Sequence, residues 1–281
     1  MALRIIFMGT PDLACASLRR LLVSPECDVV AVVTQPDRPK GRDLKLQASP
    51  VKLTALAVGK PVLQPARARE PGFLAELVSL QPDLVVVAAF GQILPVPVLE
   101  VPRLGCINVH TSLLPRYRGA APIQWALLNG DAQTGVTIMK MDAGMDTGDI
   151  LTQVATPIAS NETAESLHDR LAELGAELLL QTIPGYAQGT IMPRPQPADG
   201  VVHAPKIRKH DGQIDWTQPA HAILNRLRAL TPWPGVFTFI RTGGSQHLLK
   251  IWKAEALTAP GEATTSAGTV VQADKSDLLV A

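Results

Sequence analysis

The first part of the chain alternates between short apolar runs and longer segments with helical spacing. The apolar runs cover residues 3–8, 28–34, 83–90 and 105–110. Uninterrupted apolar runs of this length are typical of strands buried on both faces, as in parallel sheets with crossover helices. The pattern therefore predicts an α/β fold: a Rossmann-like, mostly parallel sheet with flanking helices.

The turn after the first run carries a helix-start signal. Thr10 is the predicted N-cap and Pro11 the first residue of a helix over 11–22. Gly9 has no partner glycines, so the turn lacks the G-x-G-x-x-G fingerprint and a nicotinamide dinucleotide site is disfavoured. Further along, the spacing predicts helices over 119–128 and 163–183 and strands over 135–141 and 150–158, the strands flanking a loop over 142–149.

The chain changes character near residue 190. Four prolines between 193 and 205 exclude regular helix and favour an extended connection. The later segments are a predicted helix over 220–230, hairpin strands over 236–241 and 247–257, and a surface loop over 258–268. We therefore expect an N-terminal domain over 1–190, a proline-rich linker over 191–205 and a smaller β-rich domain over 206–281.

Composition narrows the class of protein. The apolar fraction of 46% suits a globular protein, and the longest apolar runs are far shorter than the roughly 20 residues that cross a bilayer. Cys15, Cys27 and Cys106 have neither paired nor zinc-ligand spacing, so we expect no metal and a cytoplasmic location. With a net charge of +1, the protein as a whole does not attract nucleic acid electrostatically. Any contact with nucleic acid therefore requires a local cluster of basic residues.

The most informative polar residues lie in the run 108–119. Side chains alternate along a strand, so Asn108 and His110 share one face with Cys106. If the fold brings Asp146 close, an amide, an imidazole and a carboxylate can stabilise an oxyanion and move a proton, as acyl transfer requires. We interpret Cys106 as a packing residue rather than a nucleophile.

Residues 108–119 and 142–148 together resemble the formyltetrahydrofolate-dependent formyltransferases, whose signature is Asn-x-His, Ser-Leu-Leu-Pro and a downstream Asp. The resemblance implies that Asn108, His110 and Asp146 are catalytic and that 10-formyltetrahydrofolate is the formyl donor. It also implies a folate site beyond the strand ends. The implied folate-binding residues are Phe90, Gln92, Ile93, Leu94, Ser112, Leu113, Leu114, Pro115, Ala143 and Gly144.

The shared signature does not choose the formyl acceptor, but the segment 34–52 does. From Arg38 to Lys52 it holds five cations against the single carboxylate of Asp43. Composition alone favours a solvated loop, yet the segment resembles the inserted loop of members that formylate methionyl-tRNA, with Arg42 as the key contact. The implied tRNA-binding residues are Arg38, Lys40, Arg42, Lys45, Lys206, Arg208 and Lys209.

Motifs in 206–235 resemble the C-terminal domain of the same family, an OB-like barrel that helps to bind tRNA. We interpret Trp216 and Trp233 as core anchors rather than base-stacking platforms. The sequence stops at 278–281 within an apparent strand, where family members usually continue, so we expect an incomplete barrel.

Together these resemblances imply an enzyme that transfers a formyl group to the amino group of methionyl initiator tRNA for translation initiation. We expect it to act as a monomer, with folate and initiator tRNA as partners and without a membrane. Two alternatives remain open. One is formylation of a small amine, such as a sugar nucleotide or glycinamide ribonucleotide; the other is a catalytically silent folate-binding or RNA-binding module.

Overall fold

The computed structural model describes residues 2–40, 45–257, 265–274 and 277–281. Its centre is a seven-stranded sheet in the order β10-β9-β7-β6-β1-β2-β5. The five strands at the β5 end are parallel, whereas β9 runs antiparallel to both β7 and β10. The strands are β1 (Leu3–Gly9), β2 (Cys27–Val33), β5 (Val62–Leu63), β6 (Leu84–Ala88), β7 (Cys106–His110), β9 (Gln133–Lys140) and β10 (Ile150–Pro157).

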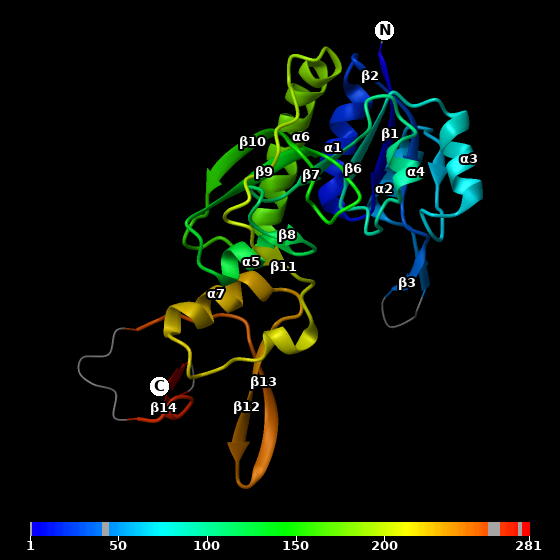
Figure 1. The fold of residues 1–281 in the computed structure, drawn as a ribbon. Coiled ribbons are helices and arrows are strands. Elements are labelled where there is room, and N and C mark those ends of the chain that lie inside the picture. The colour runs from blue at the N-terminus through cyan, green and yellow to red at the C-terminus, as the bar shows by residue number, and fades with distance from the viewer. Residues whose placement is uncertain (1, 41–44, 258–264, 275–276) are drawn as a thin grey trace.

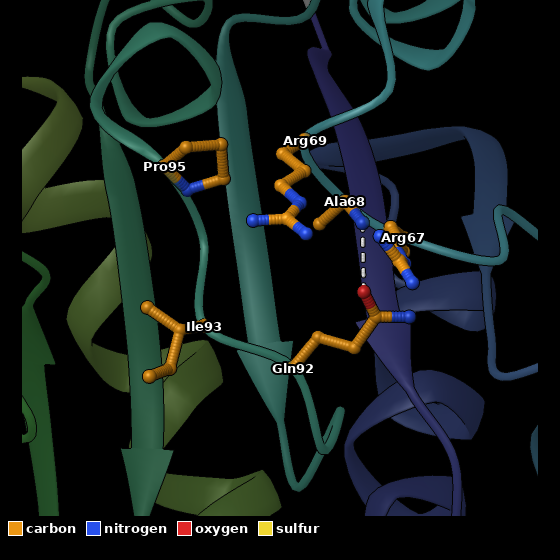
Figure 2. Close-up of a pocket in the computed structure, with 6 residues that line it drawn as sticks. All are labelled: Arg67, Ala68, Arg69, Gln92, Ile93 and Pro95. Carbon is orange, nitrogen blue, oxygen red and sulfur yellow. Dashed lines mark hydrogen bonds between the residues drawn. The ribbon is translucent and has the colours of Figure 1, made fainter.

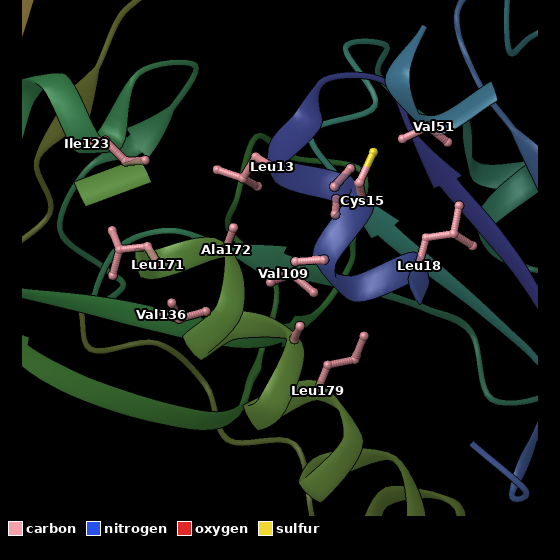
Figure 3. Packing of buried hydrophobic residues seen from close by; sticks show 14 of the residues in the cluster. Leu13, Cys15, Leu18, Val51, Val109, Ile123, Val136, Leu171, Ala172 and Leu179 are labelled. Carbon is pink, nitrogen blue, oxygen red and sulfur yellow. The ribbon is translucent and has the colours of Figure 1, made fainter. Parts of the chain in front are cut away.

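Helices cover both faces of the sheet (Figure 1). On one face α1 and α6 pack together over residues such as Phe7 and Val109, as Figure 3 shows for Val109. On the other face, Met8 and Val87 pack with the short helices α3 and α4. The helices of this domain are α1 (Asp12–Val23), α2 (Pro50–Ala57), α3 (Pro71–Ser79), α4 (Val96–Leu99), α5 (Pro122–Leu128) and α6 (Ala164–Ala187). The predicted α/β class is thus confirmed.

Two local predictions near helix starts are wrong. Helix α1 begins one residue later than predicted, at Asp12, with Pro11 as N-cap, because the Thr10 hydroxyl donates to the Phe90 carbonyl instead of capping the helix. Gly119 is not helical: it lies in β8 (Arg118–Gly119), which pairs with β11 (His203–Ala204) from the proline-rich segment. The helix that follows begins at Pro122, at its N1 position.

Helix α6 begins and ends where local signals act. Thr163 forms a capping box with Ser166, which satisfies backbone donors of the first turn. The helix continues past Pro184 to Ala187, four residues beyond the predicted end. Of the predicted apolar stripe, Leu167 and Leu171 are fully buried, whereas Leu174 and Leu178 are partly buried and pack against the core.

The C-terminal region extends from α5 and α6. It contains a short 3-10 helix (Lys209–Gly212), α7 (Ala220–Leu230) and four strands. Among the described residues these strands form two separate two-stranded sheets and no closed barrel. The strands are β12 (Val236–Thr242), β13 (Ser245–Ile251), β14 (Val270–Ala273) and β15 (Leu278–Val280).

The two regions are joined by specific contacts. The indole of Trp125 donates to the Pro205 carbonyl, and Arg228 of α7 donates to backbone carbonyls of Ala159 and Glu162. Trp216 is partly buried and its indole donates to Thr238, which fits its prediction as an anchor. Trp233 is 55% exposed, so the prediction that it is a core residue is wrong. Across the described residues, no helix is both long and apolar enough to span a membrane.

Candidate active site

The site lies where β6 and β7 end at the carboxyl edge of the sheet. Both strands are parallel to β1, and in parallel α/β sheets ligands bind beyond this edge. Asn108 and His110 are both buried and lie on the same face of β7. The apolar neighbours Ile107 and Val109 pack in the core on the opposite face. The predicted alternation is therefore confirmed.

Asp146 approaches this face from the loop that joins β9 to β10. One carboxylate oxygen accepts a hydrogen bond from the backbone nitrogen of Gly119 at 2.8 Å. The other lies 3.5 Å from Nδ2 of Asn108. Asp146 has a φ of +53°, a conformation that non-glycine residues adopt rarely. The amide, the imidazole and the carboxylate predicted as catalytic residues are thus brought together.

The loop around Asp146 is shaped by its glycines. A Cβ atom at Gly144 would lie 2.0 Å from the Thr147 hydroxyl, and one at Gly148 would lie 1.8 Å from the Lys140 carbonyl. Asp142 closes the turn by accepting hydrogen bonds from the Gly144 nitrogen and the Thr147 hydroxyl. The spacing of glycines and aspartates in 142–149 therefore fits the backbone path that carries Asp146 to the site.

His110 is oriented by a backbone carbonyl. Its Nε2 lies 3.0 Å from the Tyr117 carbonyl oxygen, which can only accept, so Nε2 carries a proton. Its Nδ1 faces the site and lies 3.7 Å from a carboxylate oxygen of Asp146. In the neutral ring Nδ1 can accept a proton, and in the charged ring it becomes a donor beside a carboxylate.

Tyr117 is itself firmly held. Its φ is +63°, and its buried ring lies beneath the guanidinium of Arg116, 5.1 Å from the ring centre. The phenol donates to Asp131 at 2.8 Å and accepts from Asn129 at 3.0 Å. Burial raises the pKa of Tyr117, so the phenol keeps the proton that it donates. This cluster fixes the carbonyl that orients His110.

The predicted folate residues fall into two groups. The side chains of Ser112, Leu114, Pro115, Phe90 and Leu94 are buried. The Ser112 hydroxyl, for example, donates to the Arg116 carbonyl at 2.6 Å. The more accessible group consists of Gln92, Ile93, Leu113, Ala143 and Gly144.

A hollow of about 380 Å³ lies against the segment that follows β6 (Figure 2). Gln92 and Ile93 line it together with Arg67 and Arg69, which sequence reasoning did not single out. The Gln92 side chain accepts from the Ala68 nitrogen at 2.7 Å and so ties the two walls together. Ile93 is 75% exposed, which leaves an apolar surface beside two cations.

The predicted tRNA-binding residues lie outside this hollow. Arg38 and Lys40 lie on β3 (Arg38–Lys40) and Lys45 on β4 (Lys45–Gln47), a short hairpin that projects from the same end of the molecule as the C-terminal region (Figure 1). Arg42 lies outside the described residues. Lys45 is exposed, as are Lys206, Arg208 and Lys209.

Part of the positive charge of the hairpin segment is paired internally. Lys52 forms a 2.7 Å ion pair with Asp37, whose pKa is lowered chiefly by that hydrogen bond. Arg38 donates to the Gln35 side chain at 3.1 Å. The five cations counted in the sequence therefore overstate the charge that is free for a partner.

Cys106 has the packing role expected for it. The thiol lies at the base of the site face, 1% exposed, and burial raises its pKa to about 12. A thiol in this state carries almost no thiolate at neutral pH. Among the described residues, no cluster of three or more His, Cys, Asp or Glu side chains could hold a metal ion.

Sequence reasoning missed one residue that reaches the site from the proline-rich segment. The Gln196 side chain donates to the backbone carbonyls of Asp146 and Gly148 and accepts from Arg118. Its position between prolines indicated only an extended chain. No periodicity or motif marks a single glutamine whose partners lie far away in the sequence.

Known proteins resemble this chain along both of its regions. A family model described as formyl transferase matches residues 3–183, and one described as formyl transferase, C-terminal domain matches residues 206–281. Methionyl-tRNA formyltransferase of Citrifermentans bemidjiense is 51% identical over 263 residues, covering 92% of this chain and 81% of that protein. The enzyme of the same name from Myxococcus xanthus is 50% identical over 278 residues, covering 99% and 86%.

Solved structures share the fold at low identity. A 4-N formyltransferase from Francisella tularensis superimposes with a TM-score of 0.69 at 17% identity, covering 90% of this chain and 99% of that one. An N-formyltransferase from Helicobacter canadensis, solved with folinic acid and dTDP-3-aminofucose, gives 0.62 at 23% identity, covering 81% and 80%. With both of its domains matched and relatives half identical along nearly its whole length, the chain belongs to the formyl transferase family.

Proposed function

We propose that this protein transfers the formyl group of 10-formyltetrahydrofolate to the free amino group of methionyl initiator tRNA. The observation that carries the proposal is the convergence of Asn108, His110 and Asp146 beyond the carboxyl edge of the sheet. The relatives that are half identical over most of their length carry the name of this activity.

The chemistry needs an oxyanion site and a path for one proton. The amine nitrogen attacks the formyl carbon, and the carbonyl oxygen becomes an oxyanion. The Asn108 amide has a donor for this oxygen, and the charged ring of His110 supplies a second through Nδ1. Each such donor accelerates acyl transfer roughly 100- to 1,000-fold.

Asp146 is placed to assist the transfer of a proton from the amine to the folate. The amine loses a proton as the new C–N bond forms, and N10 of the folate gains one as the old C–N bond breaks, so no net proton is released. The Asp146 carboxylate lies close to both His110 and Asn108 and stabilises the charged imidazole while the proton moves. The product is N-formylmethionyl-tRNA, with tetrahydrofolate as leaving group.

The hollow beside Gln92 and Ile93 suits the donor. A pterin is flat and carries several donors and acceptors, which backbone groups of 92–94 and 143–146 can meet. The exposed apolar side chain of Ile93, which lines the hollow, suits the remaining ring system. Folate also ends in glutamate carboxylates, and the guanidinium groups of Arg67 and Arg69 line the same hollow.

The acceptor site is proposed on the cationic hairpin and on 206–209. Lys45, Lys206, Arg208 and Lys209 are exposed and can contact phosphates. By resemblance, Arg42 is the main hairpin contact. The three cysteines are free, which suits a reducing cytoplasm, and we propose that the protein acts there as a monomer.

The test is single-turnover formyl transfer from 10-formyltetrahydrofolate to a panel of methionyl initiator tRNA, methionyl elongator tRNA and amine-bearing sugar nucleotides. We expect formylation of initiator tRNA, reduced roughly 100-fold or more by Asn108→Ala. Transfer only to a sugar nucleotide would replace the acceptor in this proposal. No transfer to any amine would refute the enzymatic function.

The hairpin is tested separately. Arg42→Ala should raise KM for methionyl-tRNA and leave folate binding unchanged, because phosphate contacts serve only the acceptor. Lys60→Ala is the matched control, since Lys60 precedes β5 at the opposite edge of the sheet and pairs with Asp28. Equal KM values in the two variants would remove Arg42 from the acceptor site.

A further inference from the structure

Gln196 joins the proline-rich segment to the loop that carries Asp146. Its Nε2 donates to the carbonyl oxygens of Asp146 at 2.8 Å and Gly148 at 2.7 Å. Its Oε1 accepts from Nε of Arg118 at 3.1 Å and from Nη2 at 2.8 Å. A glutamine amide has two donor hydrogens and two acceptor lone pairs, so this side chain makes all four of the hydrogen bonds that it can make.

These bonds act on a backbone that needs support. Asp146 has a positive φ, and such a residue persists only where its surroundings determine its conformation. Gln196 fixes the carbonyl of Asp146, while the Gly119 nitrogen fixes its carboxylate at 2.8 Å. Arg118, whose guanidinium donates to Gln196, is the neighbour of Gly119. One amide therefore connects both segments that determine where the carboxylate lies.

The rest of the proline-rich segment strengthens the same connection. The Arg118 nitrogen donates to the Val202 carbonyl at 2.9 Å, and the Ala120 nitrogen donates to the Ala204 carbonyl at 2.9 Å. Residues 196–204 thus lie beside residues 118–120, which follow β7 in the chain. Figure 1 shows the two short strands of this contact, β8 and β11, next to each other.

We propose that Gln196 is a positioning residue for formyl transfer, holding the Asp146 carboxylate in register with His110 and Asn108. This inference rests on the proposed function. A displacement of about 1 Å in a reacting group can cost roughly 100-fold in rate. Loss of Gln196 should therefore act on kcat, since its side chain contacts only protein groups.

The experiment compares Gln196→Ala with Thr182→Val in the full chain. Thr182 is fully buried in α6, donates to the Leu178 carbonyl at 2.7 Å and lies 2.6 Å from the Thr152 hydroxyl, so its loss removes buried hydrogen bonds away from the site. We expect Gln196→Ala to lower kcat roughly 30- to 100-fold, while KM for the folate changes less than about threefold. Thr182→Val should lower stability with kcat retained.

Two further variants separate positioning from general stability. Gln196→Glu keeps the acceptor for Arg118 but turns a carboxylate oxygen towards two carbonyls, so it should lose as much kcat as the alanine variant. In the Asp146→Asn background, Gln196→Ala should cost less than about threefold, because the residue that it positions has already changed.

The inference is overturned if Gln196→Ala resembles Thr182→Val in kcat, if the loss appears in KM, if Gln196→Glu is fully active, or if the two changes multiply independently. Failure of the proposed function has a different signature: the unaltered protein would not formylate methionyl-tRNA at all. The comparison of variants is then made with whichever amine the unaltered protein does formylate, and the same four outcomes decide.

Discussion

Gly119 is a position where one added methyl group should disturb the Asp146 carboxylate directly. Its backbone nitrogen donates to Asp146, and its φ of +122° is a conformation that L residues rarely adopt. An added Cβ atom would lie 2.7 Å from the Ala204 carbonyl oxygen, whereas ordinary van der Waals contact begins at 3.4 Å. Gly119→Ala therefore adds both backbone strain and a contact with backbone.

The expected size follows from these two effects. An alanine at a strained φ costs roughly 1–3 kcal/mol of folding free energy. To relieve the contact, β8 and β11 must separate by roughly 0.5–1 Å, and close-packed surroundings pass such a shift to their neighbours. The hydrogen bond to Asp146, now 2.8 Å, would then weaken as it lengthens to roughly 3.3–3.8 Å. We expect kcat to fall about 10- to 100-fold.

The assay pairs urea unfolding with single-turnover formyl transfer. Gly200→Ala is the matched control, because Gly200 lies in the same proline-rich segment with a φ of +78° and open space around its Cβ position. The control should lose stability through backbone strain alone and keep kcat. If Gly119→Ala and Gly200→Ala lower stability and kcat equally, the close approach of β8 to β11 does not position Asp146.

Three further outcomes follow from the site and its surroundings. Asp146→Asn should lower kcat about 100- to 10,000-fold with folate binding retained, and a loss under about fivefold would contradict its role beside His110. Cys106 should resist alkylation by iodoacetamide in the folded protein at pH 8, because burial raises the pKa of its thiol to about 12; labelling as fast as in urea would contradict that burial. The hydrogen bonds of Arg170 lower the pKa of Glu162, so this group stabilises the fold above its unfolded pKa and loses that contribution as pH falls through its lower folded value. Glu162→Gln should therefore flatten the decline of unfolding free energy between about pH 5 and 3, and an unchanged decline would refute the linkage.

The sequence was informative wherever one period or one motif decides the structure. Val109 and His110 point to opposite faces because strand side chains alternate, and Leu171 is buried because its spacing is helical. The motifs in 108–119 and 142–148 also indicated the correct family. Local signals failed where a distant group competed: Thr10 reads as an N-cap, yet its hydroxyl donates to a carbonyl 80 positions away.

The parts of the site that the sequence did not reveal depend on long-range pairing. Gln196 bonds to carbonyls 48 and 50 positions away and to a guanidinium 78 positions away. Tyr117 orients His110 through its main-chain carbonyl, which every residue possesses, so no side-chain pattern announces that role. Trp233 shows the opposite error, because it was interpreted as a core anchor and is 55% exposed.

The path of residues 196–204 also bears on how the protein can be divided. A fragment cut at residue 190 would contain Asn108, His110 and Asp146, yet it would leave behind the amide and the strand that brace them. Adding the remainder as a separate chain should restore turnover, because it supplies Gln196 and β11 again. For exchanges of acceptor domains between relatives, the junction therefore belongs after Pro205, where the chain leaves the active site, rather than after helix α6.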